Sequence, residues 1–460
     1  MQKIVMHVLG RSLLAGVLVT AAACGHDAQP AGGTPDALTW AAPVAVTGAL
    51  GGAAPVFAAS PGGSLTLAWV SAPGNGSDGE LSIRPDAWVQ ATHELRDPLG
   101  GLAINGEVPP KIAYGPDGAL YATYLVARAT AGKKRPEMAI RFARSTDGGA
   151  RWTTPVTVTA TATGDSVFGS YDDHALYAAP DGAIYVSWLA ASGKMSNTYF
   201  VRSTDRGATW SRPAVVDPGG SCPCCRTAMT SGPDGALYVA WRKIYPGDSG
   251  AREVRDIVVA RSDDRGRTWH SPIRVHADDW HVTYCPNAGP SIRVGEDGTV
   301  HVAWWTGKEG HAGVQYAQST DRAATFSAPV ALDIARFSRP SHVQLALGSG
   351  AARGVVLAAW DDGTLETPRI VARVSRDGGR TFGAAQALSD TGAVAGYPIV
   401  GLRGDTALVA WQQRSAAGVA SDSVAHAHMD MTQPASHLHT IGALQVVARS
   451  GILPAPSRAP

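Results

Sequence analysis

The sequence predicts an all-β protein, and three observations carry that prediction. Of the 460 residues, 53 are Gly and 30 are Pro, which interrupt helices and favour tight turns. Between these turns, apolar and polar residues alternate over short stretches, as in Ala183–Trp188. A turn pattern also recurs at nearly constant spacing, which is typical of repeat architectures. We therefore expect many short antiparallel strands organised in equivalent units.

The recurring turn pattern combines Asp, Gly and an aromatic residue. Its clearest copies are Arg144–Trp152, Arg202–Trp210 and Arg261–Trp269, and weaker copies are Gln318–Phe326 and Ser375–Phe382. The central carboxylates are 58, 59, 57 and 56 residues apart, at Asp147, Asp205, Asp264, Asp321 and Asp377. Asp accepts local backbone hydrogen bonds and Gly tolerates positive φ, so each copy predicts a β-hairpin turn.

A second repeat alternates with the first and consists of a turn followed by a strand that ends in an aromatic residue. Four regular copies are Gly115–Tyr124, Ala179–Trp188, Gly232–Trp241 and Gly295–Trp304, and less regular copies end at Trp69, Trp360 and Trp411. These seven copies predict seven structural units of roughly 58 residues, which matches the spacing of the turns.

The N-terminal segment Leu38–Val46 resembles the strand that follows each turn, although it precedes all of them. We expect it to complete the last unit and to close a ring, which would remove the open sheet edge. The other strands of that unit are expected near Thr406–Trp411 and Ser423–Met429. Two alternatives stay open: Gly442–Val447 closes the ring, or Leu38–Val46 forms a cap on six units.

The Ser-x-Asp-x-Gly-x-x-Trp pattern resembles the Asp-box, or BNR repeat, of the sialidase superfamily and related β-propellers. The resemblance implies a β-propeller over residues 38–447, followed by a C-terminal tail at 448–460. Seven four-stranded blades are favoured, with the first box degraded to Ile83–Trp88, and six blades are the fallback. In the families it resembles, the box is structural and lies away from the active site.

Blade topology predicts where a site would lie, because the loops that lead into the innermost strands converge on the ring axis. Polar residues gather in these loops: Lys111, Asp172, Asp173, His174, Arg226, Arg339, His342 and Tyr397. We expect a funnel that binds glycans or small molecules. A long charged loop, Arg242–Asp256, either forms a wall of this funnel or is simply solvated.

The sialidase resemblance implies roles for these residues. Arg226, Arg242 and Arg339 would bind a substrate carboxylate, Asp172 or Asp173 would be the acid/base, and Tyr397 the nucleophile, while Lys111, His174 and His342 would contact the substrate. The sequence also departs from the family, since its Arg-Ile-Pro motif is missing and no Glu is paired with Tyr397. A divergent glycoside hydrolase and a glycan-binding module therefore both stay open.

Four cysteines in two segments do not belong to the scaffold pattern. Cys222, Cys224 and Cys225 lie in one loop, and Cys285 lies in a loop that opens the adjacent unit. They could form disulfides, bind Cu or Zn with help from His281 or His174, or form a redox-active dithiol. The His426–His428 and His437–His439 pairs are weaker metal candidates. A metal or redox protein and a non-catalytic interaction scaffold are thus the alternatives to a glycan-directed function.

The N-terminus resembles a bacterial lipoprotein signal. Lys3 and Arg11 accompany the apolar stretch Ser12–Ala23, and small residues precede Cys24. The resemblance implies cleavage of residues 1–23, lipidation of Cys24 and a tether over 24–37, with ordinary secretion as the alternative. In such lipoproteins an Asp at the second position after the lipidated Cys is associated with retention in the inner membrane. Because this position is His26, the outer membrane of the cell envelope is favoured. A formal charge of +1 gives no reason to expect binding to nucleic acid or to acidic lipids. We therefore expect contact with a membrane only through the lipid anchor.

Overall fold

The fold was determined as a computed structural model. It describes residues 37–47, 51–71, 79–86, 92–103, 108–128, 137–159, 171–192, 195–245, 253–282, 284, 286–335, 338–364, 367–415 and 444–453. All of them belong to one compact unit, Thr34–Pro460. No α-helix occurs among them, and η2 (Gly350–Ala352) is a single 3-10 turn. The predicted all-β fold is confirmed. Within the described residues, no helix is long and apolar enough to span a membrane.

Four sheets contain four antiparallel strands each. They are formed by β3 (Ala53–Ala59), β4 (Leu65–Ser71), β5 (Glu80–Arg84) and β6 (His93–Leu95); by β7 (Lys111–Tyr114), β8 (Leu120–Arg128), β9 (Glu137–Ser145) and β10 (Val156–Thr157); by β19 (Ser291–Val294), β20 (Val300–Thr306), β21 (Ala312–Ser319) and β22 (Val330–Ala335); and by β23 (Gln344–Leu347), β24 (Val356–Asp361), β25 (Ile370–Ser375) and β26 (Gln386–Ala387).

A fifth sheet contains eight strands, because two four-stranded groups touch at one residue pair. The groups are β11 (Tyr171–Ala178), β12 (Ile184–Ser192), β13 (Met195–Ser203) and β14 (Ala214–Ser221), and β15 (Ala228–Ser231), β16 (Leu237–Tyr245), β17 (Val254–Ser262) and β18 (Ile273–Arg274). The single pair that joins them is Ser221 with Lys243. This link fixes the start of the loop that carries three of the cysteines.

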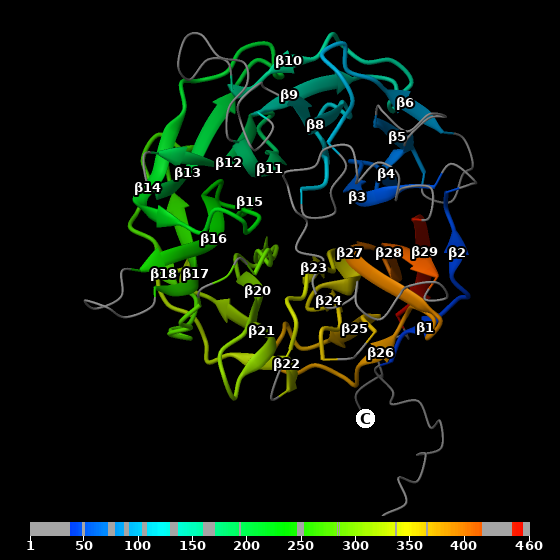
Figure 1. Cartoon of the computed structure of the whole chain (residues 1–460), viewed down its shortest axis with the longest axis vertical. Helices are drawn as coiled ribbons and strands as arrows, with labels where there is room; N and C mark the ends of the chain where they lie inside the picture. The colour runs from blue at the N-terminus through cyan, green and yellow to red at the C-terminus, as the bar shows by residue number, and fades with distance from the viewer. Residues whose placement is uncertain are drawn as a thin grey trace, which may run out of the picture. The chain divides into compact units, whose positions relative to one another are not determined.

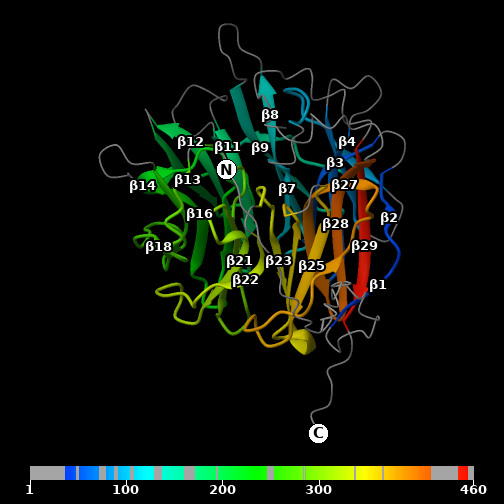
Figure 2. The ribbon, with the colours of Figure 1, turned by 60° about the horizontal axis from the view of Figure 1, so that its bottom comes forward.

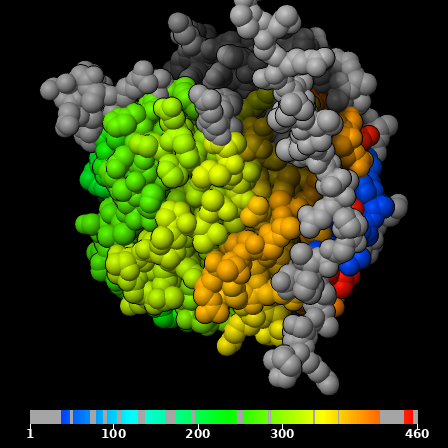
Figure 3. All heavy atoms as spheres, turned by 90° about the horizontal axis from the view of Figure 1, so that it is seen from below, coloured from blue at the N-terminus to red at the C-terminus, as the bar shows by residue number. Residues whose placement is uncertain are grey.

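The last sheet combines both ends of the described chain. It contains β27 (Ala393–Arg403), β28 (Thr406–Ser415) and β29 (Gln445–Ile452), together with β1 (Thr39–Trp40) and β2 (Val44–Ala45). Both N-terminal strands pair antiparallel with β29, so the blue and red segments lie side by side in Figures 1 and 3.

The strand next to β28 differs from the sequence prediction. The partner of β28 is β29, whereas Ser423–Met429, which we expected in this place, lies outside the described residues. Strand β29 also continues to Ile452, past the boundary predicted at residue 447, because its last residues pair with both β28 and β1. A weakly alternating strand separated from β28 by a long polar stretch gave little signal in the sequence.

The innermost strand of each group contacts the innermost strands of its neighbours around a common axis. The contacts run in the order β3, β7, β11, β15, β19, β23 and β27, and β27 in turn contacts β3. Figures 1 and 2 show this arrangement from two directions, with the sheets radiating from the centre. The predicted β-propeller is therefore confirmed.

The hydrophobic core lies between adjacent sheets. In one cluster, Tyr121 and Ile140 of β8 and β9 pack against Ile184 and Trp188 of the next sheet, and all four are at most 2% exposed. The tryptophans that end the second repeat are likewise buried. In these strands both faces are buried, because every sheet is covered by a neighbouring sheet on each side.

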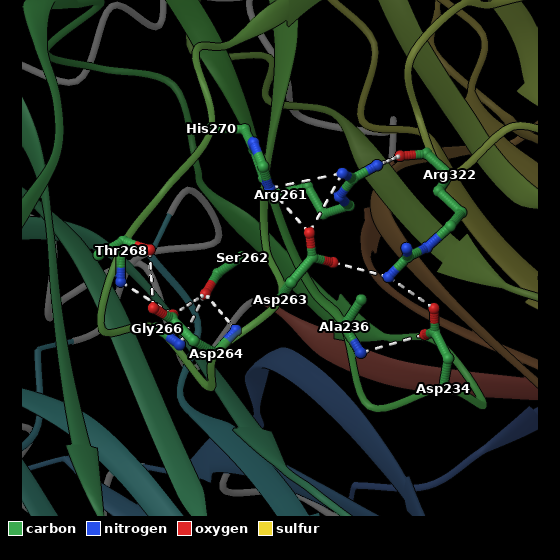
Figure 4. A network of polar contacts seen from close by, with 10 residues as sticks. All are labelled: Asp234, Ala236, Arg261, Ser262, Asp263, Asp264, Gly266, Thr268, His270 and Arg322. Carbon is green, nitrogen blue, oxygen red and sulfur yellow. Dashed lines mark hydrogen bonds and ion pairs between the residues drawn. The ribbon is translucent and has the colours of Figure 1, made fainter.

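The Asp-box turns follow one hydrogen-bond pattern. In the box of Figure 4, the Gly266 N–H donates to Ser262 Oγ at 2.8 Å, and the Thr268 N–H donates to Asp264 Oδ1 at 2.9 Å. Asp147, Asp205, Asp321 and Asp377 accept the equivalent bond at 2.8–2.9 Å. These side chains satisfy their own turn, which agrees with the structural role that the resemblance implies.

The boxes and the Pro-Asp-Gly-type turns lie at the same end of the sheets. Arg322, which belongs to the next box, forms ion pairs with Asp234 of such a turn at 2.8 Å and with Asp263 at 2.6 Å (Figure 4). Since the innermost strands end at these turns, they begin at the opposite end. Residues that precede the innermost strands therefore lie away from the boxes.

Each box also packs on the sheet before it. Gly207, at φ 87°, lies so close to Phe142 that an added Cβ would be 2.0 Å from the nearest ring atom. Trp210 packs edge-on against the same ring, with the two ring centroids 5.2 Å apart. The same arrangement joins Gly266 to Phe200 and Gly379 to Tyr316. The weak box has Ala323 in the place of this Gly, and there the preceding sheet offers Val259 instead of an aromatic ring. The smaller neighbour thus leaves room for the Cβ of Ala323, although the first box keeps Gly149 beside the aliphatic Ile83.

Candidate functional site

A cavity of about 190 Å³ lies on the axis, and every innermost strand contributes to its wall. Its polar lining comes from Lys111, Arg226, Ser291, Arg293 and Gln344, and its apolar lining includes Phe57, Met229 and Ile399. Several of these residues stand just before or at the start of an innermost strand. The cavity therefore belongs to the end opposite the Asp-boxes, where sequence analysis expected the site.

The charged groups in the cavity wall are all cationic. Lys111, Arg226 and Arg293 come from three different sheets, and none of the described lining residues is Asp or Glu. Burial lowers the pKa of Lys111 well below its usual value, and the charge of Arg226 lowers it further. Burial also lowers the pKa of Arg293. Burial thus disfavours the charged form of Lys111, and an anionic ligand that stabilises this form would bind favourably here.

Two residues of β11, Asp173 and His174, interact electrostatically with Lys111. Asp173 acts electrostatically on Lys111 and partly offsets the lowering of its pKa. Its backbone is in the left-handed region at φ 54°, at an irregular step in the pairing of β11 with β12. His174 is 1% exposed, and burial lowers its pKa to about 3, so the ring is neutral at physiological pH. These residues shape the start of β11 beside the cavity.

A second cluster of titratable groups lies where β24 meets β27. His342 Nδ1 lies 2.7 Å from a carboxylate oxygen of Asp361, and the N–H of Tyr397 donates to the same oxygen at 3.2 Å. The Tyr397 and His342 rings are 4.3 Å apart, and Tyr397 has φ 55°. Interactions with His342 hold the pKa of Asp361 below its usual value despite complete burial. The predicted neighbours His342 and Tyr397 are therefore brought together, with Asp361 between them.

Two of the three predicted carboxylate-binding arginines do not line the cavity. Arg242 is fully buried, and its guanidinium donates to the carbonyls of Arg255, Ala288 and Trp305 at 3.2, 3.1 and 2.7 Å. Its role is to join two adjacent sheets, which corrects the expectation of a substrate contact. The backbone of Arg339 bonds to Gly363, and its side chain is not part of the cavity wall.

The three cysteines of one loop form a compact cluster. Cys222 Sγ is 3.6 Å from Cys224 Sγ and 3.4 Å from Cys225 Sγ, distances much longer than the roughly 2.05 Å of a disulfide bond. Cys222 and Cys225 are buried, and Arg255 Nη1 lies 3.5 Å from Cys222 Sγ. Hydrogen bonds from the other thiols lower the pKa of Cys222, whereas burial raises that of Cys225. Neither His281 nor His174 belongs to this cluster.

Several predicted residues lie outside what the structure describes. These are Cys24, Cys285, the four histidines His426, His428, His437 and His439, and the side chain of Asp172. His281 is described and forms an isolated bridge with Val254. Its place is thus in the backbone pairing beside the long charged loop.

The sequence did not point to Arg293 or Asp361, and it marked Arg255 only as part of the charged segment Arg242–Asp256. Arg293 stands two positions after Ser291 in β19, so strand alternation places both on one face, and this was the signal that could have found it. Asp361 ends the β24 strand directly after Trp360, and Arg255 lies on β17. Nothing in the local sequence of Asp361 and Arg255 marks their distant partners.

Residues 118–416 match the BNR repeat-like domain. The chain belongs to the BNR repeat-like domain family. The predicted BNR-repeat relationship is thereby confirmed. No curated protein sequence matches the chain.

Solved structures similar to this BNR repeat-like chain include glycan-active enzymes. An ulvan lyase of polysaccharide lyase family PL25 is 13% identical over 80% of this chain and 93% of its own, with a TM-score of 0.51. The polysaccharide lyase Uly1 is 12% identical over 85% and 88% of the two chains, with a TM-score of 0.50. A Hadza microbial sialidase is 20% identical over 76% and 74%, with a TM-score of 0.45. At these identities the likeness concerns the fold.

Proposed function

We propose that this BNR repeat-like propeller binds an anionic glycan in its axial cavity. The observation that carries the proposal is the set of three cations, Lys111, Arg226 and Arg293, in a cavity whose described wall has no carboxylate. A uronate, sialate or sulfate group would supply the missing negative charge through charge-assisted hydrogen bonds. The glycan-active enzymes among proteins of similar fold agree with this class of ligand.

The binding test compares charged and neutral sugars on the same protein. We expect calorimetry to detect 3′-sialyllactose or a glucuronate oligosaccharide, and to detect lactose much more weakly. Arg226→Gln should weaken anionic binding roughly 10–100-fold, the loss expected for one hydrogen bond to a charged group. Arg353→Gln is the control, because Arg353 is exposed and pairs with Glu296 away from the cavity. Equal affinity for charged and neutral sugars contradicts the proposal.

A second candidate function is cleavage of the bound glycan. It is favoured by the ring contact of Tyr397 with His342, where the buried carboxylate of Asp361 binds the imidazole of His342 and the backbone N–H of Tyr397. A His–Asp pair next to a phenol has the parts of an acid–base or nucleophilic system. Cleavage predicts that Tyr397→Phe abolishes turnover of a sialoside or uronoside while binding persists. Unchanged turnover, or its absence in the unmodified protein, rejects this candidate.

We further propose that the propeller has seven blades closed by the N-terminal strands. Support comes from the cycle of contacts among the innermost strands and from the pairing of β1 and β2 with β29. Export, lipidation of Cys24 and an outer-membrane location remain predictions from the N-terminal sequence. Mass spectrometry of the N-terminal peptide from the native host tests them, because a lipidated Cys24 would be its first residue.

A further inference from the structure

We infer that Cys222, Cys224 and Cys225 together bind one Cu(I) ion, in a site separate from the axial cavity. The three Sγ atoms lie within 4.8 Å of one another, and two of their separations are 3.4 and 3.6 Å. Three sulfurs bound to one ion at roughly 2.3 Å would be about 4 Å apart. The two known separations therefore need to widen by only about 0.4–0.6 Å to admit the ion.

The loop that carries the thiols is anchored at both ends. At its start, the Cys222 N–H donates to the Arg242 carbonyl at 2.8 Å, and Ser221 pairs with Lys243. At its end, the Thr227 hydroxyl donates to the Asp173 carbonyl at 3.0 Å. Since the flanking backbone is held by two other strands, the sulfurs are gathered before any ion binds. This preorganisation lowers the entropy cost of binding.

The surroundings of the cluster suit thiolates. Three thiolates on a monovalent ion leave a net charge of −2, which needs nearby positive charge. Arg255 Nη1 lies 3.5 Å from Cys222 Sγ, and the buried guanidinium of Arg242 also acts on this sulfur. The same Arg255 group donates to the Tyr284 carbonyl at 3.3 Å, which holds it in place.

The donor set favours Cu(I) over Zn(II). Thiolates suit both ions, but structural Zn(II) almost always takes four ligands, whereas the described residues offer three sulfurs and no His, Asp or Glu beside them. Burial of Cys222 and Cys225 also keeps water, a ready fourth ligand for zinc, away from two of the three sulfurs, while Cys224 is half-buried. A low-coordinate soft ion therefore fits the cluster best.

The test is an anaerobic titration of the reduced full chain with Cu(I), in competition with bicinchoninate. We expect one Cu(I) per chain and an X-ray absorption spectrum with three sulfurs and no nitrogen in the first shell. Cys225→Ser and Cys222→Ser should each weaken Cu(I) binding at least 100-fold. Pro223→Ala, at an exposed position between the cysteines, is the matched control in the same loop and should bind like the unmodified protein. Thermal unfolding of each metal-free variant shows whether the fold is retained.

Three results overturn the inference. The first is a reduced chain that binds Cu(I) no more tightly than a folded Cys222→Ser variant. The second is a four-coordinate Zn(II) site that Cu(I) does not displace. The third is a cluster held as a disulfide that binds no Cu(I) after reduction. The cavity residues Arg226 and Thr227 directly follow Cys225, but sugar binding and Cu(I) binding are measured with different ligands and different variants, so failure here leaves the proposed function unaffected.

Discussion

At the scale of single residues, His174 shows how burial makes the fold sensitive to pH. The ring is buried beside Lys111, and burial lowers its pKa to about 3. In the unfolded chain a histidine takes up a proton near pH 6.5. Between these two values the unfolded state holds one more proton than the folded state, so the free energy of unfolding falls as the pH falls through this window.

We therefore predict that His174→Phe reduces the loss of stability in acid. Between pH 7 and 5 the unmodified protein should lose about 2 kcal/mol more of its free energy of unfolding than the variant does. Urea unfolding at the two pH values measures both. His301 is buried with its pKa lowered to about 4 and contributes in the same direction, but equally in both proteins. His311→Asn, at an exposed site, is the control, and an equal pH dependence in His174→Phe contradicts the account.

The site residues show where residue-scale prediction from the sequence ends. Lys111 and Arg226 could be predicted, because topology places the starts of the innermost strands at the axis. The same reasoning misassigned Arg242, because it lies one residue after a conspicuous Trp and its three carbonyl partners come from distant segments. Hydrogen bonds from a buried guanidinium to carbonyls far away in the chain leave no local pattern in the sequence.

At the scale of elements, the Asp-box and the sheet before it vary together. Gly207 has no space for a side chain because Phe142 fills the position, whereas Ala323 faces Val259. A cavity of about 180 Å³ remains beside Val259 and Ala323, where three of the other sheets hold Phe142, Phe200 or Tyr316. The repeat could be found from the sequence, but this pairing needed the contacts between sheets.

We predict that Gly207→Ala lowers the free energy of unfolding by roughly 2–4 kcal/mol, through its left-handed φ and the clash with Phe142. Chemical denaturation measures this loss. Ala323→Gly, at the equivalent position, is the control and should change stability by less than about 1 kcal/mol. Equal effects at the two positions contradict the packing argument.

The cavity beside Val259 allows the converse experiment. Val259→Phe alone should destabilise the protein, because the new ring meets the Cβ of Ala323. Adding Ala323→Gly should restore at least about 1 kcal/mol, since the ring then occupies the existing cavity. A double-mutant cycle measures this coupling, and additive effects contradict it.

In the molecule as a whole, the N-terminal strands β1 and β2 lie in the same sheet as the C-terminal strand β29. Leu38 is 3% exposed, and its backbone exchanges hydrogen bonds with the Gln386 side chain at 3.2 and 3.0 Å. The form of Leu38–Val46 predicted that this segment joins the last sheet, whereas the strand beside β28 was expected at Ser423–Met429 and is β29, which overlaps the alternative segment Gly442–Val447. Only the register of β29 revealed which segment the N-terminal strands join.

Ring closure predicts that Leu38→Ala costs about 2–4 kcal/mol of unfolding free energy, as for a leucine in a central core. Urea unfolding measures this cost. Val44→Ala, on the same N-terminal segment but 61% exposed, should cost less than about 0.5 kcal/mol. A Leu38→Ala variant as stable as the control means that the N-terminal strands are peripheral to the fold.

We propose the axial cavity as an anion-binding glycan site. A crystal structure of the chain with a bound glucuronate or sialate oligosaccharide tests this proposal most directly. The account predicts the anionic group on the axis, within hydrogen-bond distance of Lys111, Arg226 or Arg293. Sugar bound at the Asp-box end, or on the outer strands with the axis left to solvent, would contradict it.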